Sequence, residues 1–268
     1  MQKKQENIDV GKNLENVKHK IVVLSGKGGV GKSTISSNLA LYLSKKGYKT
    51  GVLDSDIHGP SIPKIMGVED EKGIMQNNLI QPIKTKEGLK IMSMGYLLPD
   101  KDSPVIWRGP MKMGAIRQLL GQVNWGKLDY LIIDLPPGTG DEPLSIAQLL
   151  PDVDGVIIVT TPQDVALVSV RKSINFVRKL NLNVIGIVEN MSGFTCPHCG
   201  KKIDIFKTGG GKKASEDFKI PYLGSIPLDP DIVEIGDSKE KIDIKNKLTE
   251  KSYMDFVENV ERIIGGEK

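Results

Sequence analysis

The run Gly26-Lys-Gly-Gly-Val-Gly-Lys-Ser33 constrains this chain more than any other part of its sequence, because it fits the pattern G-x-x-x-x-G-K-[ST]. Glycines let backbone N–H groups turn inward onto an anion. Lys32 supplies positive charge for terminal phosphates, and the Ser33 hydroxyl is a ligand for Mg²⁺. We therefore expect a phosphate-binding loop made of Gly26, Lys27, Gly28, Gly29, Val30, Gly31, Lys32, Ser33 and Thr34.

The residues on either side of this loop predict the strand–loop–helix unit that binds phosphate. An apolar, β-branched run of strand length, 20–25, precedes the loop. After the loop, Ile35, Leu39, Tyr42 and Leu43 follow a helical spacing. A helix N-terminus at the end of a glycine loop attracts anions. The chain is thus predicted to bind a nucleotide.

Strands and helices alternate along the rest of the chain. Near-continuous Val/Ile/Leu strands separated by helices predict an α/β fold, a mostly parallel central sheet with helices on both faces. The polar segment 1–18 is expected to be a flexible N-terminal arm or a short surface helix, and 19–268 a single domain, with an irregular excursion at 67–104. The expected strands are 20–25, 49–54, 89–93, 128–134, 155–160, 183–188 and 222–226; the expected helices are 111–121, 143–150, 164–180, 211–219 and 249–264.

Composition excludes several classes of protein. A hydrophobic content of 39% and a charged content of 26% are ordinary for a soluble globular protein. No apolar run approaches the length of a membrane span, and the N-terminus lacks the apolar core of a signal peptide, so we expect a cytoplasmic protein. The net charge is only +4 and the lysines are interspersed with acids, so nucleic acid is not an expected partner. The segment 254–264 has an apolar face but an acidic polar one, so a membrane is not expected either.

Three aspartates at predicted strand ends are candidates for metal binding and hydrolysis. Asp134 ends an apolar strand, which is where a phosphate-loop protein needs a carboxylate to hold Mg²⁺, directly or through water. Asp54 and Asp56 follow another strand, and ligands in such sheets bind outside the carboxyl ends of the strands. We expect Asp54 to support Mg²⁺ and Asp56 to position the attacking water. The alternative is that both residues only cap the strand and the following turn.

The identity of the base follows from an absence. The guanine-reading pattern N-K-x-D occurs nowhere in the chain, so ATP is favoured over GTP. Asn190 and the run Pro227-Leu-Asp229 each come just after a predicted strand and are expected to contact the adenine side of the nucleotide.

Cys196 and Cys199, in Cys196-Pro-His-Cys-Gly200, are the only cysteines of the chain and predict a metal-binding knuckle. A 4Fe–4S cluster or a structural zinc takes four such ligands, so a symmetric dimer that contributes two from each chain is the simplest completion. A redox dithiol is the rival. Such a motif opens a helix, whereas the residues after this one alternate like a strand.

Taken together, these runs resemble the Mrp/ApbC-type iron–sulfur carrier ATPases, within the MinD-like deviant Walker A group. The match is carried by 26–34, 54–61, Trp107-Arg-Gly-Pro-Met111, 133–141, Thr161-Pro-Gln163, 188–194, 196–200 and 226–230. The resemblance implies ATP binding with slow hydrolysis, a homodimer, and a labile 4Fe–4S cluster bridged by the two knuckles and delivered to apo-proteins. No cysteine precedes the loop, so the four-cysteine N-terminal site of eukaryotic-type members is missing.

The resemblance also implies roles for individual residues. Lys27, Lys32 and Asp56 would be the catalytic residues, and Ser33 and Asp134 would hold Mg²⁺. Lys27 would cross the dimer interface to the partner's nucleotide, although from its position alone it could equally be a solvated lysine at the rim of the loop. Arg108 suits either a phosphate or interface role or a buried salt bridge. The alternative function is a MinD/ParA-like positioning switch with a structural zinc knuckle.

Overall fold

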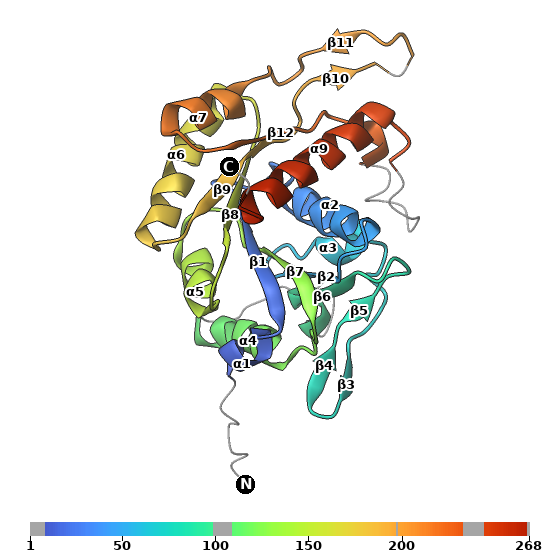
Figure 1. Cartoon of the computed structure of the whole chain (residues 1–268), viewed down its shortest axis with the longest axis vertical. Coiled ribbons are helices and arrows are strands. Elements are labelled where there is room, and N and C mark those ends of the chain that lie inside the picture. Colours follow the sequence, from blue (N-terminus) through green and yellow to red (C-terminus); the bar gives the residue numbers. More distant parts are fainter. Residues whose placement is uncertain (1–8, 99–108, 197, 233–243, 267–268) are drawn as a thin grey trace.

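The computed structural model describes residues 9–98, 109–196, 198–232 and 244–266. Its core is a sheet in the order β12-β9-β8-β1-β7-β2-β6-β5, parallel throughout except for the last strand. The strands of this sheet are β1 (Val17–Leu24), β2 (Thr50–Asp54), β5 (Ile83–Lys84), β6 (Lys90–Ser93), β7 (Leu128–Asp134), β8 (Gly155–Thr160), β9 (Val184–Glu189) and β12 (Tyr222–Ser225). The predicted α/β class and mostly parallel sheet are confirmed (Figure 1).

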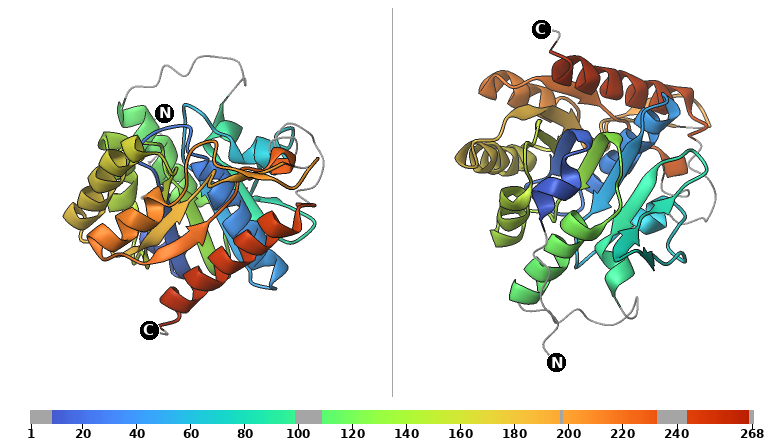
Figure 2. Two further views of the ribbon diagram at one scale, coloured as in Figure 1. Left: turned by 90° about the horizontal axis from the view of Figure 1, so that it is seen from above. Right: turned by 60° about the horizontal axis from the view of Figure 1, so that its bottom comes forward.

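Helices cover both faces of this sheet (Figure 2). One face carries α2 (Lys32–Lys45) and α9 (Lys247–Ile264), and the other carries α4 (Gly109–Gln122), α5 (Asp141–Leu149) and α6 (Asp164–Lys179). Helix α7 (Gly210–Phe218) packs beside α6 on β9. The shorter helical segments are α1 (Val10–Leu14), α3 (Ile62–Ile65) and η1 (Met94–Leu97). Among the described residues, no helix combines the length and apolar character needed to cross a membrane.

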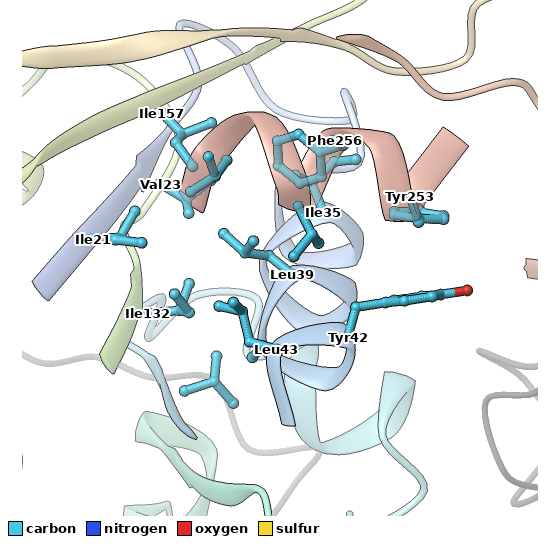
Figure 3. Close-up of a cluster of buried hydrophobic side chains, with 14 of the residues drawn as sticks. Ile21, Val23, Ile35, Leu39, Tyr42, Leu43, Ile132, Ile157, Tyr253 and Phe256 are labelled. Atoms are coloured by element: carbon cyan, nitrogen blue, oxygen red, sulfur yellow. The ribbon is translucent and has the colours of Figure 1, made fainter. Parts of the chain in front are cut away.

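The central strand β1 shows why both faces are covered. Ile21 and Val23 belong to the apolar cluster beneath α2 and α9, whereas Val22 and Leu24 belong to the cluster on the opposite face. Successive side chains of a strand point to opposite faces, so an unbroken apolar run buries both. Figure 3 shows Ile21 and Val23 with residues of α2 and α9, including Leu39 and Phe256.

The irregular excursion contains a small hairpin at the edge of the molecule. Strands β3 (Ile74–Gln76) and β4 (Leu79–Gln81) pair antiparallel, and β5 pairs antiparallel with β6 at the end of the main sheet. Asn77 and Asn78 both have positive φ, the conformation that a two-residue hairpin turn requires and that asparagine tolerates. The sequence predicted an excursion here and the strand 89–93 that corresponds to β6, but it did not predict β3, β4 or β5.

For residues 9–18 the structure shows the second of the two expected alternatives, a short helix, followed by the start of β1. Helix α1 packs on α4, with Val10 and Leu14 buried, and Val17 already begins β1. The side chain of Asn13 donates to the carbonyls of Leu120 (2.8 Å) and Val123 (3.0 Å). These contacts outweigh the polar composition of the segment. The first eight residues of the expected arm, and Arg108, lie outside the described residues.

Candidate functional site

Three polar side chains lie in a row where neighbouring parallel strands end. Asp134 of β7 is in register with Asp54 of β2, and Asp54 is in register with Ser93 of β6. All three are fully buried. Parallel strands present their carboxyl ends at one edge of the sheet, which is where ligands bind in such folds. The topology thus brings together two acids that lie eighty residues apart in the sequence.

The predicted phosphate loop lies beside this row and is tied to Asp134. The Lys32 ammonium lies 2.6 Å from the Asp134 carboxylate. The hydroxyls of Ser33 and Ser36 donate to the same carboxylate, each at 2.6 Å. Lys32 and Ser33 open helix α2, after Gly31 in the left-handed conformation with φ 78°. The loop therefore has the shape and charge of an anion site at a helix N-terminus.

Asp54 is held by neutral donors. Its carboxylate accepts from the Ser93 hydroxyl (3.1 Å) and from the backbone amides of Ile62 (3.2 Å) and Asp56 (3.2 Å). Burial, and then the negative charge of neighbouring Asp134, raises the pKa of Asp54 to about 7. A cation between the two aspartates would relieve this repulsion. The hydroxyl of Ser33 and the two carboxylates are the oxygen ligands that Mg²⁺ takes.

Asp56 caps the turn that follows β2. One oxygen of its carboxylate accepts from the amides of His58 (3.1 Å) and Gly59 (3.2 Å), and the side chain is half-buried. The expected turn-capping role is therefore present. Water positioning by Asp56 stays a prediction.

Asn190 supports the phosphate loop directly. Its side-chain amide donates to the carbonyl of Val30 at 2.9 Å, and a Cβ on Gly31 would lie 2.2 Å from that amide nitrogen. Gly31 is thus required both for its positive φ and for this close approach. Lys27 is half-buried, and its carbonyl accepts from the Ser25 hydroxyl. Its reach across a dimer interface stays a prediction.

The second predicted adenine-side element has a structural task. Asp229 is buried, and its carboxylate accepts from the hydroxyl of Thr249 in α9 and from the amide of Asp231. Pro227 lines a cavity of about 540 Å³ between α7, α9 and the segment 192–195. The contacts of Asn190, Pro227 and Asp229 with a base stay predictions.

A hairpin of β10 (Phe194–Thr195) and β11 (Lys202–Ile203) projects from the sheet domain (Figure 1). Cys196 and Cys199 lie in the turn between its two strands, which pair antiparallel. The turn is closed by Cys196 N–H to Lys201 O (3.0 Å) and by Gly200 N–H to Cys196 O (2.8 Å). This hairpin lacks the helix N-terminus that a redox dithiol uses.

Both thiols are accessible and free of a disulfide. Cys199 is exposed and Cys196 is half-buried. The backbone amide of Cys199, then that of His198, then the Cys199 thiol lower the pKa of the Cys196 thiol. Among the described residues, no group of three His, Cys, Asp or Glu side chains is placed to hold a metal ion. One chain thus presents two thiols and, within those residues, no further ligand beside them.

Sequence reasoning missed three polar residues of this region. Ser93 ends a predicted strand, and Ser36 lies one helical turn after Lys32, so strand ends and the i+4 spacing were the available signals. Glu189 is fully buried at the end of β9 and binds segments far along the chain. Nothing local in the sequence marks Glu189 as buried.

Comparison with known proteins identifies relatives over almost the whole chain. A family model described as ParA, NUBPL iron-transfer P-loop NTPase, matches residues 16–261. An iron–sulfur cluster carrier protein of Methanocaldococcus jannaschii is 51% identical over 264 residues, covering 98% of this chain and 91% of that protein. The cytosolic Fe-S cluster assembly factor CFD1 of Kluyveromyces lactis is 51% identical over 241 residues, covering 88% and 85%.

Solved structures show the same fold. A nucleotide-binding protein of Archaeoglobus fulgidus in complex with ADP superposes with a TM-score of 0.76 at 40% identity, covering 85% of this chain and 89% of that one. The septum site-determining protein MinD of Pyrococcus horikoshii, with Mg-ADP, gives a TM-score of 0.67 at 22% identity, covering 93% and 98%. The sheet and its phosphate loop are therefore those of a MinD/ParA-like P-loop NTPase.

Proposed function

The chain belongs to the family of NUBPL-type iron-transfer P-loop NTPases. We propose that it is an ATPase and a carrier of a 4Fe–4S cluster, which is bound at the interface of a dimer of two identical chains. The cargo is delivered to apo iron–sulfur proteins in the cytoplasm. The close relatives named as cluster carriers and as a cytosolic assembly factor support this proposal.

One observation carries the proposal, namely two accessible thiols at the tip of a projecting hairpin. A 4Fe–4S cluster is held by four thiolates. The chain has two cysteines, so a second copy supplies the other pair. A cluster held between exposed hairpins is reachable by a recipient protein, as transfer requires.

The nucleotide site supports the ATPase part of the proposal. Lys32 neutralises phosphate charge, and Ser33 and Asp134 hold Mg²⁺ with Asp54 beside them. The metal would offset the charge that develops on the phosphates during transfer. Asp56 orients the attacking water. Lys27 reaches across to the partner's nucleotide, which would make hydrolysis depend on the dimer.

Anaerobic reconstitution tests the cargo. We expect about four irons and four sulfides per dimer, with the broad absorbance of a thiolate-ligated cluster at about 400 nm. Cys196→Ser and Cys199→Ser should each remove the cluster and leave ATP binding intact, because the hairpin lies outside the phosphate loop. One zinc per dimer without iron would contradict the carrier function and favour a structural staple in a positioning switch. A reversible dithiol without metal would favour the redox alternative.

A further inference from the structure

The buried carboxylate of Glu189 binds the two segments that flank the cysteine hairpin β10–β11. They are the outgoing stem, residues 191–193, and the returning stem, residues 204–211, which ends in the first turn of α7. On the outgoing stem, the Ser192 hydroxyl donates to Oε1 of Glu189 at 2.5 Å. On the returning stem, the amide of Gly209 donates to the same oxygen at 2.9 Å, and the amide of Gly211 donates to Oε2. Glu189 is fully buried, so these donors take the place of water around its charge.

This attachment requires glycines at 210 and 211, because any larger side chain there would collide with neighbouring atoms. A Cβ on Gly211 would lie 2.9 Å from the Cβ of Glu189, and a Cβ on Gly210 would lie 2.2 Å from the carbonyl oxygen of Pro162. The returning stem therefore packs backbone-close against the ends of β8 and β9. Both stems are fixed at a single place, the carboxyl end of the sheet.

The residue after Glu189 holds the phosphate loop. Asn190 donates to the carbonyl of Val30 and lies against Gly31, as described above. Two neighbouring residues on one strand end thus contact the nucleotide loop and the cysteine hairpin. Only five residues separate Asn190 from Cys196, and two of them, Met191 (φ 57°) and Gly193 (φ 76°), have positive φ.

A second contact path runs parallel to this one through α6. A Cβ on Gly26, the first glycine of the loop, would lie 2.5 Å from the carbonyl oxygen of Ser169 in α6. Pro162, just before that helix, is the residue against which Gly210 packs. Close backbone contacts therefore run from the phosphate loop through α6 to the same returning stem that Glu189 holds.

We propose that Glu189 is a positioning residue that couples nucleotide binding at the phosphate loop to the exposure of Cys196 and Cys199. A nucleotide orders the loop, Asn190 moves with it, and Glu189 tightens its hold on both stems. The coupling gives the proposed carrier function a way to control when its cargo is accessible, and it rests on that function only in the identity of the cargo.

The test compares the rate of thiol modification of the full-length protein under two conditions. In the first, a chelator keeps the protein free of metal. In the second, the chelator is removed and Mg²⁺ and a non-hydrolysable ATP analogue are added. The chain contains only the two cysteines of the hairpin, so a disulfide reagent reports on them alone. In the wild type we expect the analogue to slow modification about fivefold or more, the usual size of a coupling between sites. In Glu189→Gln we expect no such slowing, with analogue affinity within about twofold of wild type.

Asp154→Asn is the matched control. This carboxylate also accepts from a backbone amide, that of Lys20, at 2.8 Å, and it neighbours neither the loop nor the hairpin. It should keep the wild-type slowing. Ser192→Ala removes only the hydrogen bond from the outgoing stem to Glu189, so it should reduce the slowing and provides a test if Glu189→Gln does not fold.

Either of two results would overturn the coupling. The first is a rate of thiol modification in the wild type that does not change when the analogue is added. The second is a wild-type slowing of modification in both Glu189→Gln and Ser192→Ala. Neither depends on iron. A protein that takes up no cluster but shows nucleotide-dependent thiols would refute the proposed cargo and keep the coupling. A protein that binds the cluster, but whose thiols are modified at the same rate with and without nucleotide, would support the proposed cargo and refute the coupling.

Discussion

Asp54 and Asp134 lie side by side in register at the ends of β2 and β7, and both side chains are fully buried. Two carboxylates without an intervening cation repel each other, and burial strengthens the repulsion. Lys32 and two serines compensate Asp134, whereas Asp54 has only a hydroxyl and backbone amides. The two carboxylates are therefore placed to bind a divalent cation. Without the cation, their repulsion destabilises the folded protein.

Neutralising Asp54 should stabilise the metal-free protein in a pH-dependent way. The pKa of Asp54 is raised from 3.8 to about 7 on folding, so the folded state holds this proton more tightly than the unfolded state. Its contribution is fully present below pH ~4 and is lost as the pH rises towards ~7. Asp54→Asn avoids that loss. In a chelator, its Tm should exceed that of the wild type at pH 8 by roughly 2–4 °C or more, and the gap should shrink by pH 5.

The same variant should bind Mg²⁺–ATP more weakly. A constant Tm difference at both pH values would show that Asp54 does not carry the titrating charge.

Lys32→Ala should abolish ATP affinity, with a loss of at least about a hundredfold, or about 2.7 kcal/mol. The substitution removes the phosphate's counter-charge and leaves Asp134 buried with only serine donors. Titration with a fluorescent ATP analogue measures the loss. Lys27→Ala in the same loop is the matched control and should bind normally. Equal affinities in the two variants would contradict the assignment of Lys32.

Lys27→Ala should bind ATP but lose hydrolysis, because Lys32 supplies the charge for the phosphates within the loop, whereas the half-buried Lys27 is proposed to act on the partner's nucleotide. Mixed dimers of Lys27→Ala with a chain that cannot bind ATP, Lys32→Ala, provide the test. If Lys27 acts across the interface, the single bound ATP faces the intact Lys27 of the other chain and is hydrolysed. If Lys27 acts within its own loop, that mixed dimer is inactive.

Asp56→Ala should bind ATP and hydrolyse it at least about a hundredfold more slowly, in line with the loss of a water-positioning group. Asp56→Asn separates this role from turn capping, since an amide oxygen can accept from His58 and Gly59 as the carboxylate does. Slow turnover in both variants supports water positioning. Normal turnover in Asp56→Asn would show that Asp56 only caps the turn after β2 and does not position water.

Leu14→Ala should destabilise the protein by about 2–4 kcal/mol, because it leaves a cavity between α1 and α4. Leu248→Ala is the matched control, with a side chain 57% exposed, and should change the stability by less than about 0.5 kcal/mol. Urea unfolding compares them. A Leu14 variant as stable as the control would restore the flexible arm expected from the sequence.

Local patterns were sufficient wherever the cause is local. The glycine loop places Lys32 and Ser33 at a helix start because the φ of Gly31 and the helix-forming run after it are encoded within a few residues. The apolar strands were equally readable, since burial on both faces demands unbroken Val/Ile/Leu runs such as 131–133. The number of cysteines was equally readable, since two thiolates per chain are fewer than the four that a 4Fe–4S cluster takes.

The tertiary structure decided what depends on strand order. Asp54 and Asp134 meet because β2 pairs with β7, and nothing in either strand specifies that neighbour. Leu14 is buried because a helix about a hundred residues later covers it. Glu189 reads as an ordinary strand-end acid until the returning stem of the hairpin surrounds it with amides. Long-range packing supplies these partners, and the free energy of a buried charge depends on partners rather than on its own residue type.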